Sequence, residues 1–369
     1  MIPKYIRLSN ILREQLEASA LSGANKLPTE KALCDKYHVS RQTIREALSI
    51  LEKDNLIVKK QGSGTYINFQ AKNQARRIAI IVGSDSDYIF PNFISELRTQ
   101  FQKAGYKADI FRHENSYLSE RALLENIMRE GYSGIVVEPV KSSLPSPNAE
   151  AYEHLKSSGC KLLFIWAANP NLSSHPCIRA DDVFGGYIAG KHLILNGHTN
   201  ISLFLNRDDI CGINRYNGFL TAASDYGIVP RDDMVCWYYD NDIRMLRLHD
   251  KSAFIKHSVD FFKKSTAVIC QNDEVAYWLI KTFSQSGIRV PEDISIISFD
   301  NSYLSDFASS HITSLSHKKG ELTAIICESL IRLINGETIP RTALSWKIIK
   351  RSSDIVLKNN SSGADLDSD

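Results

Sequence analysis

The N-terminal part of the chain holds two arginines, Arg41 and Arg45, whose spacing suits one kind of chemistry. Residues four positions apart share one face of a helix, so both guanidinium groups would point the same way. Arginine pairs bidentately with guanine, and glutamine pairs in a similar way with adenine. Gln42 directly follows Arg41. This short run therefore carries the groups that read base edges in the major groove of DNA.

The residues around these side chains predict the helix that would present them. Ile44, Ala47, Leu48 and Leu51 fall at i, i+3, i+4 and i+7, which defines one buried helix face. Ser40, just before Arg41, is a good N-cap. Two more helices are predicted upstream, one opened by the N-cap residue Thr29 and one with the apolar face Leu8, Ile11, Leu12 and Leu16.

A hairpin is predicted directly after these helices. Residues 56–60 and 65–67 are strand candidates on either side of the glycine-rich run Gln61-Gly-Ser-Gly64, whose tip could approach the DNA backbone or the minor groove. Three helices followed by a hairpin predict a winged helix-turn-helix domain. The alternative interpretation of any single one of these residues is that it belongs to a small helical domain with arginines on its surface.

The distribution of charge supports a separate DNA-binding part. Residues 1–68 contain eleven Lys and Arg against seven Asp and Glu, a net charge of +4, whereas the whole chain carries +2. The remaining residues are therefore slightly acidic. A basic small domain on a near-neutral large one confines phosphate contacts to one end of the chain.

Residues 4–67 resemble the N-terminal domain of the GntR family of bacterial transcription regulators. The resemblance rests on Leu27-Pro-Thr-Glu30, on residues 39–48 and on residues 61–67, while Thr29 and Asn55 stand where Ser and Gly are commoner. It implies that double-stranded operator DNA is the partner. The residues implied to contact the operator or shape the wing, together with Gln42 and Gln61 at the predicted DNA-facing positions, are Lys4, Tyr5, Glu30, Arg41, Gln42, Thr43, Arg45, Gln61, Gly62 and Gly64.

Length and composition limit the architecture of the remaining chain. The chain has 369 residues and is 43% hydrophobic, so about 300 residues beyond the head remain for two α/β lobes. No apolar run approaches the roughly 20 residues of a membrane helix, and no signal peptide is recognisable. Seven cysteines without a Cys-x-x-Cys spacing indicate reduced thiols in a cytoplasm. The predicted parts are a head over 1–68, a linker over 69–76, an effector-binding and dimerisation domain over 77–351, and a tail over 352–369 that is expected to be disordered beyond 358.

Short apolar runs alternate with amphipathic ones throughout the large domain, which predicts parallel sheets covered by helices. The predicted strands are 78–82, 108–111, 134–138, 161–165, 201–205, 235–239, 267–270 and 295–299. The clearest predicted helices are 93–104, 120–129, 183–196 and 275–286. In such sheets ligands bind beyond the carboxyl ends of the strands, so the residues directly after each strand are the candidate ligand contacts.

These positions are polar in an otherwise apolar scaffold. Carboxylates, amides and guanidinium groups offer donors and acceptors for several hydroxyls, and an aromatic ring could stack on a sugar. The pattern lacks the clustered cations or the glycine-rich loop that would bind phosphate. It also lacks a Ser/His/Asp set and a metal-ligand set. The sequence therefore favours a small polyhydroxy ligand without cofactor or metal. The candidates found this way are Asp87, Tyr88, Phe90, Glu138, Lys141, Arg215, Asn272, Asp273, Asp300 and His317.

Several of these residues have a structural alternative. Asp273 and Asp300 could cap the helices that come after them, and Arg215 could be the partner in a structural ion pair. His317 and Lys141 are the weakest candidates. A fusion of an enzyme to the head would need a Schiff-base lysine and a cofactor phosphate cradle, and the sequence offers neither. An enzyme is therefore not expected.

Residues 76–350 resemble the LacI/periplasmic sugar-binding fold, through residues 268–276 and 290–300 and through Asp181-Asp182 with Gly185-Gly186. The resemblance implies a homodimeric cytoplasmic repressor of sugar-utilisation genes, associated with the nucleoid when bound to its operator. It also places Asp181 in the effector site and implies chain crossings between lobes near Asp181, near Asp300 and past Gly320. Residues 86–91, residues 137–139 with Lys141-Ser142, and Arg215 with Asn217-Gly-Phe219 are similar to arabinose-responsive members of the family. This similarity implies L-arabinose as effector, with another pentose, a hexose or a nucleoside as alternatives.

Overall fold

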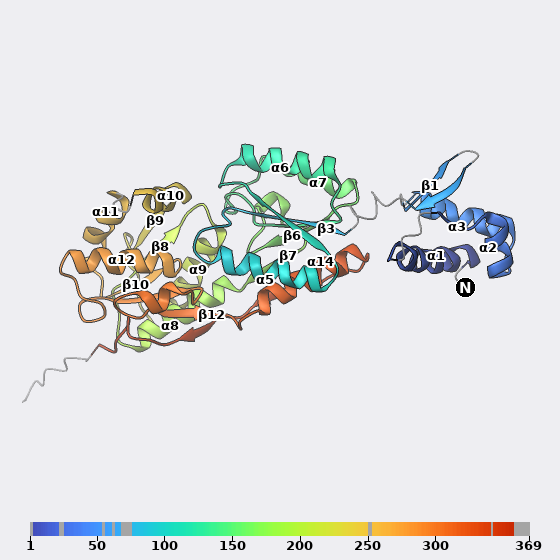
Figure 1. Cartoon of the computed structure of the whole chain (residues 1–369). Helices are drawn as coiled ribbons and strands as arrows, with labels where there is room; N and C mark the ends of the chain where they lie inside the picture. The colour runs from blue at the N-terminus through green and yellow to red at the C-terminus, as the bar shows by residue number, and fades with distance from the viewer. Residues whose placement is uncertain are drawn as a thin grey trace, which may run out of the picture. The chain divides into compact units, whose positions relative to one another are not determined.

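The computed structural model describes residues 3–21, 26–53, 56–60, 63–67, 76–249, 253–340 and 342–357. The chain divides into a small N-terminal unit and a large unit that begins at Ile78 (Figure 1). Gln61, Gly62, the predicted cap residue Asn55, most of the predicted linker and the tail from residue 358 onward lie outside the described residues.

The small unit contains the three predicted helices and the predicted hairpin. These are α1 (Lys4–Leu21), α2 (Glu30–Tyr37), α3 (Arg41–Lys53) and the antiparallel strands β1 (Ile57–Lys60) and β2 (Gly64–Ile67). Both predicted N-caps are confirmed, because Thr29 Oγ1 accepts from the amide of Ala32 and Ser40 Oγ accepts from that of Thr43. The predicted face of α3 is buried in the core with Leu8 and Leu12, whereas Ile11, predicted to be buried, is 43% exposed.

The large unit is built on two six-stranded sheets. The first, in the order β13-β7-β6-β5-β3-β4, comprises β3 (Arg77–Val82), β4 (Lys107–Arg112), β5 (Gly134–Val137), β6 (Lys161–Ile165), β7 (Cys177–Ala180) and β13 (Thr342–Leu344). The second, in the order β14-β12-β11-β10-β8-β9, comprises β8 (Ile201–Asn206), β9 (Val235–Tyr238), β10 (Ala267–Cys270), β11 (Ser295–Phe299), β12 (Thr313–Ser316) and β14 (Lys347–Ile349). The pairs from β13 to β3 in the first sheet and from β12 to β9 in the second are parallel as predicted, and the β12–β14 pair is antiparallel.

Helices cover both faces of each sheet and so form two lobes. In the first lobe, α5 (Phe90–Lys103) and α14 (Glu321–Ile334) pack on one face, and α6 (Tyr117–Glu130) and α7 (Ala149–Ser157) lie on the other (Figure 1). In the second lobe, α8 (Asp182–Leu195) and α9 (Ile210–Asp225) face one core. The opposite core is closed by α10 (Asp240–His249), α11 (Ala253–Phe262) and α12 (Asp273–Gln285). The short helices are η1 (Pro170–Leu172) and α13 (Leu304–Phe307).

The chain crosses between the lobes at three places. It leaves the first lobe between β7 and α8 at Asp181, returns between β12 and α14, and leaves again between β13 and β14. The predicted crossing near Asp181 is confirmed, and the last crossing, near Trp346, lies past Gly320 as predicted. The crossing predicted near Asp300 is wrong, because β11 and β12 are neighbours in the same sheet. The second crossing lies instead between β12 and α14.

The effector domain extends past the predicted boundary at residue 351. Ser353 exchanges two hydrogen bonds with Ile296, its carbonyl accepting from the Ile296 amide at 2.7 Å and its hydroxyl donating to the Ile296 carbonyl at 2.6 Å. The Leu357 amide donates to the Asn196 carbonyl at 2.8 Å. Residues 352–357 are therefore part of the second lobe. Ser352, Ser353 and Asp354 are polar, and backbone groups make several of the contacts, so this role is hard to recognise from the sequence.

Candidate DNA-binding surface and effector cavity

The polar residues predicted to read bases lie together on the exposed side of α3. Arg41, Gln42 and Arg45 are exposed. Arg45 Nε lies 3.1 Å from Glu30 Oε2 of α2, and Gln42 donates to Glu46 at 3.0 Å. Exposed pairs of this kind contribute little stability. The arginine can therefore exchange Glu30 for a base without a large energetic loss.

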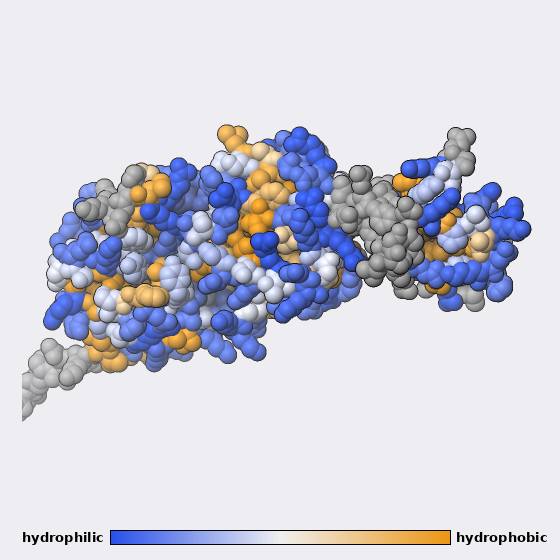
Figure 2. Space-filling model, in the orientation of Figure 1, coloured by the Kyte–Doolittle hydropathy of each residue, from blue (hydrophilic) through white to orange (hydrophobic). Residues whose placement is uncertain are grey.

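The remaining head candidates that the structure describes lie in α1, in α3 itself and in the hairpin. Lys4 is exposed and Tyr5 is half-buried at the start of α1, and Thr43 Oγ1 lies 3.0 Å from Ser40 Oγ. Gly64 has φ +117°, a conformation that favours glycine. The visible surface of the small unit is largely hydrophilic (Figure 2).

The wing carries two cations that the sequence did not single out. Lys26 Nζ and Lys60 Nζ lie 5.5 Å and 5.2 Å from the ring centre of Tyr66. Lys26 reaches the hairpin through a β-bridge with Tyr66, across 40 positions of sequence. Local spacing could not have revealed this pairing. Both lysines add positive charge where the hairpin was predicted to approach DNA.

The large unit contains a cavity of about 680 Å³ between its two lobes. Its walls come largely from the segments directly after β3, β5, β8 and β10. In each sheet the strand order reverses at this place, between β3 and β5 in the first and between β8 and β10 in the second. Ligands of open α/β sheets bind at such switch points, so the cavity lies where the fold predicts it.

The cavity is rich in carboxyl groups, and burial changes their protonation. Glu138 accepts a hydrogen bond from the amide of Gly83 at 2.7 Å, and burial raises the pKa of Glu138 to about 8. Burial also raises the pKa of Asp240 to about 6, although Asn206 donates to its carboxylate. Near neutral pH Glu138 therefore keeps its proton and can donate a hydrogen bond, while Asp240 accepts.

Arg215 combines both roles that the sequence left open. Its guanidinium lines the cavity and is paired with the buried Asp182, with Nε and Nη2 each 2.9 Å from Oδ1. It also donates to the carbonyl of Gln271 and lies 4.0 Å from the ring centre of Phe299. The charge on Asp182 raises the pKa of Arg215 against the opposing effect of burial. Arg215 is therefore a structural ion-pair partner as well as a cavity residue.

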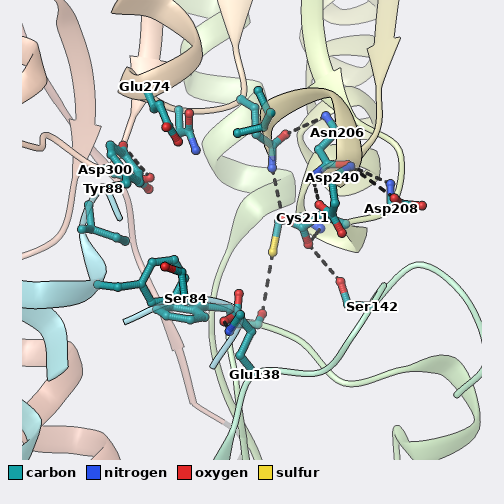
Figure 3. A pocket seen from close by; sticks show the side chains of 18 of the residues that line it. Ser84, Tyr88, Glu138, Ser142, Asn206, Asp208, Cys211, Asp240, Glu274 and Asp300 are labelled. Carbon is teal, nitrogen blue, oxygen red and sulfur yellow. Dashed lines mark hydrogen bonds between the residues drawn. The ribbon is translucent and has the colours of Figure 1, made fainter. Parts of the chain in front are cut away.

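Predicted residues of both lobes meet at one side of the cavity. The Tyr88 hydroxyl donates to Asp300 Oδ2 at 2.9 Å and accepts from the amide of Asp273 at 3.2 Å. Asp87 Oδ2 lies 3.2 Å from Nη1 of Arg247, which also makes a bidentate pair with Glu274. Apart from Asp273, these residues line the cavity, and their contacts tie the lobes together. Figure 3 shows Tyr88 beside Asp300.

The aromatic and hinge-side candidates also lie at the cavity wall. Phe90 packs edge-on against Trp166, with ring centres 5.7 Å apart. His317 lies against Trp346 at 3.8 Å between ring centres, and burial lowers the pKa of His317. Lys141 Nζ is 3.4 Å from Asp208 Oδ2. Trp166 and Trp346 add apolar surface to the cavity wall, and the sequence analysis did not single them out.

Two other predicted residues do not line the cavity. Asp181 is the N-cap of α8 and accepts from the amide of Phe184. Asp273 is fully buried, and its carboxylate accepts from the hydroxyls of Ser298 and Ser314 and from the amide of Ser302. The predicted capping role belongs to Asn272, whose Oδ1 accepts from the amide of Val275 and which also lines the cavity.

Several cavity residues were missed although the sequence held a signal for some of them. Four of them lie at or just after the ends of β8 and β9, where the strand-end rule would have found them, namely Asn206, Asp208, Asp209 and Asp240. Arg247 lies within a helix, so nothing in its local sequence marks it as a cavity residue.

Among the described residues, no group of His, Cys, Asp and Glu is arranged to hold a metal ion. No helix in the described part of the chain is long and apolar enough to span a membrane.

The fold and the two sites define the class of the protein, a transcription regulator with a DNA-binding head and a two-lobed ligand-binding domain. Residues 4–67 match the model of the bacterial regulatory proteins of the gntR family, and residues 191–353 match that of the periplasmic binding protein-like domain. The chain is 30% identical to the arabinose metabolism transcriptional repressor of Geobacillus stearothermophilus, over 92% of this chain and 93% of that protein. It is also 30% identical to the repressor of the same description from Halalkalibacterium halodurans, with 96% of each chain covered.

A solved structure agrees with this assignment at the level of the fold. The periplasmic binding protein/LacI transcriptional regulator from Alkaliphilus metalliredigens, complexed with D-xylulofuranose, has a TM-score of 0.65 and 20% identity, over 76% of this chain and 99% of that one. The chain belongs to the GntR family of bacterial regulatory proteins, in the group of the arabinose metabolism transcriptional repressors. It is a DNA-binding transcriptional repressor and not an enzyme.

Proposed function

We propose that this repressor controls genes of sugar utilisation and that L-arabinose, bound between the two lobes, releases it from its operator. The observation that carries the proposal is the cavity at both switch points, with carboxyl, amide and guanidinium groups on its walls. Such groups satisfy the several hydroxyls of a sugar. The choice of arabinose is supported by the two relatives named for arabinose metabolism.

The walls of the cavity offer chemically distinct groups to a pentose. Glu138 in its protonated form donates to a ring or hydroxyl oxygen, while Asp240 and Asp209 accept from hydroxyls. Arg215 donates from the second lobe, and the ring of Trp166 offers an apolar face for the C–H groups of a sugar. These roles need no cofactor, and a sugar held this way contacts both lobes at once.

In the proposed mechanism, sugar binding stabilises the arrangement in which the two lobes contact each other around the cavity, which we call the closed arrangement. The repressor acts as a homodimer, because a two-fold operator requires a two-fold protein. It acts in the cytoplasm and is associated with the nucleoid while it is bound to its operator. In the closed arrangement the two heads are held in a geometry that suits the operator poorly. By reciprocity, operator DNA weakens sugar binding by the same factor as sugar weakens operator binding.

The test is a titration of L-arabinose into the complex of the full chain with a fluorescent operator fragment, followed by anisotropy. The anisotropy should fall with L-arabinose and stay constant with D-galactose at the same concentrations. Release by another sugar alone would keep the mechanism and change the effector. No release by any pentose, hexose or nucleoside would contradict the proposed function.

A further inference from the structure

Two consecutive residues of the first lobe, Ser142 and Ser143, make hydrogen bonds to the start of a helix in the second lobe. Ser142 Oγ donates to Asp209 Oδ1 and accepts from the amide of Ile210, both at 3.0 Å. Ser143 adds two bonds, from its amide to the Asp208 carbonyl at 3.1 Å and from its hydroxyl to the Arg207 carbonyl at 2.8 Å. Figure 3 shows Ser142 directed toward the segment that holds Asp208 and Cys211.

The segment that these residues contact is the N-terminus of α9. The first amides of a helix have no partner within the helix. Asp209 is the N-cap, and its Oδ1 accepts from the amide of Cys211 at 3.0 Å. The neighbouring orphan amide, that of Ile210, is satisfied by Ser142 from the other lobe. The cap of α9 is thus assembled from both lobes, and it is complete only while they are in contact.

The first lobe holds Ser142 in place through a buried polar network. The side-chain amide of Asn169, which is fully buried, donates to the carbonyls of Val140, Lys141 and Leu144 at 3.1, 3.2 and 2.9 Å. Further along the same loop, Asn148 donates to the buried carboxylate of Glu120 at 2.7 Å. The loop is therefore preorganised, so Ser142 loses little conformational entropy when the lobes meet.

α9 in turn packs in close backbone contact with α8, the helix that begins at the first crossing. A Cβ atom on Gly218 would lie 1.9 Å from the carbonyl oxygen of Val183, and one on Gly186 would lie 2.0 Å from that of Arg215. The backbones of α8 and α9 therefore touch. Because α8 begins at the crossing residue Asp181, fixing the start of α9 also fixes the hinge and holds Arg215 at the cavity.

Ser142 lies at the cavity wall, but its hydroxyl is already used by Asp209 and by the amide of Ile210. We propose that Ser142 is a positioning residue that sets the effector affinity by completing the cap of α9 from the opposite lobe, and that it does so without binding the sugar itself. This inference rests on the proposed function for its link to sugar. A lost N-cap corresponds to a loss of affinity of about fivefold. Ser142→Ala should therefore weaken sugar binding and raise the inducing concentration by about this factor, while operator binding without sugar is unchanged.

The experiment compares the full-length wild type with Ser142→Ala and with the control Ser173→Ala. Ser173 is an exposed serine of the same lobe whose hydroxyl bonds the Pro170 carbonyl in its own helix turn, outside the cavity. Calorimetry with L-arabinose gives the affinity. Hydrogen–deuterium exchange of the peptide covering residues 207–214 reports on the cap, with and without sugar. Faster exchange at this peptide in Ser142→Ala, and unchanged exchange in Ser173→Ala, is the expected result.

Three outcomes would overturn the inference, and one would instead overturn the effector. A fall in affinity with unchanged exchange at α9 would make Ser142 a direct sugar contact. Unchanged affinity in Ser142→Ala would show that Ser142 takes no part in the response to sugar. Equal exchange in all three proteins would show that Ser142 does not cap α9. If L-arabinose produced no heat with the wild type, the proposed effector would be wrong, and exchange in the sugar-free proteins would still decide whether Ser142 caps α9.

Discussion

Replacement of Arg215 by alanine should destabilise the effector domain, beyond any effect on ligand binding. The exposed fractions of Arg215 and Asp182 are 6% and 4%, so the substitution leaves a carboxylate buried without its cation. Removing one partner of a buried pair costs about 3–5 kcal/mol. Burial already raises the pKa of Asp182, which shows that its environment disfavours an isolated charge.

The assay is urea unfolding of the full chain followed by tryptophan fluorescence. All four tryptophans lie in the large unit, so the signal reports on that unit alone. The double variant Asp182→Asn/Arg215→Ala should recover part of the loss, because no uncompensated charge remains. A stability of Arg215→Ala within about 0.5 kcal/mol of the wild type would refute the reasoning, because that is the usual range for surface substitutions. Both variants should fail to respond to sugar, because both lack the guanidinium.

Three further predictions concern the head and the cavity. Arg45→Ala should weaken operator binding by about 1–3 kcal/mol, measured by anisotropy, and leave the sugar affinity intact; loss of both would indicate misfolding. Lys4→Ala should reduce the salt dependence of operator binding by about one phosphate contact, and an unchanged slope would exclude that contact. Burial raises the pKa of Glu138 from 4.5 to about 8, so its stabilising contribution is complete below pH 4.5 and is lost as pH rises toward 8. Glu138→Gln should therefore gain about 1–4 kcal/mol of unfolding free energy relative to wild type between pH 5 and 8, measured by urea unfolding, and a constant difference would contradict the assignment.

The head could be predicted almost completely because its signals are local. The caps Thr29 and Ser40 and the buried face of α3 lie within one or two helical turns of the residues they act on. The exception is Lys26, which reaches the wing from a segment 40 positions away. Sequence spacing carries no information about a contact of that range.

In the large unit the sequence located the cavity but not the partners of its residues. The strand-end rule found Glu138, Asn272 and Asp300, yet it also selected Asp273, whose carboxylate is enclosed by serines from β11 and β12. The pairing of Arg215 with Asp182 and of Ser142 with Asp209 joins segments 33 and 67 positions apart. Such partners are fixed by how strands order in the sheet and how the lobes meet, which local patterns do not encode.

The misplaced crossing near Asp300 has a similar cause. The run before Asp300 is an apolar strand followed by polar residues, which is also the pattern at Asp181, where the chain does leave its lobe. After Asp300 the chain instead stays in the same lobe. It passes through α13, and β12 then pairs with β11. Only the position of β12, which the sequence analysis did not recognise as a strand, separates the two cases.

The central claim is that the cavity between the lobes binds a specific sugar. Calorimetric titration of the full chain with L-arabinose tests it most directly, with D-xylose, D-ribose and D-galactose as controls. We expect saturable heat with L-arabinose and none, or much weaker binding, with the other three. The absence of heat with L-arabinose while a control sugar binds would contradict the assigned effector, and silence with all four would contradict a sugar-binding cavity.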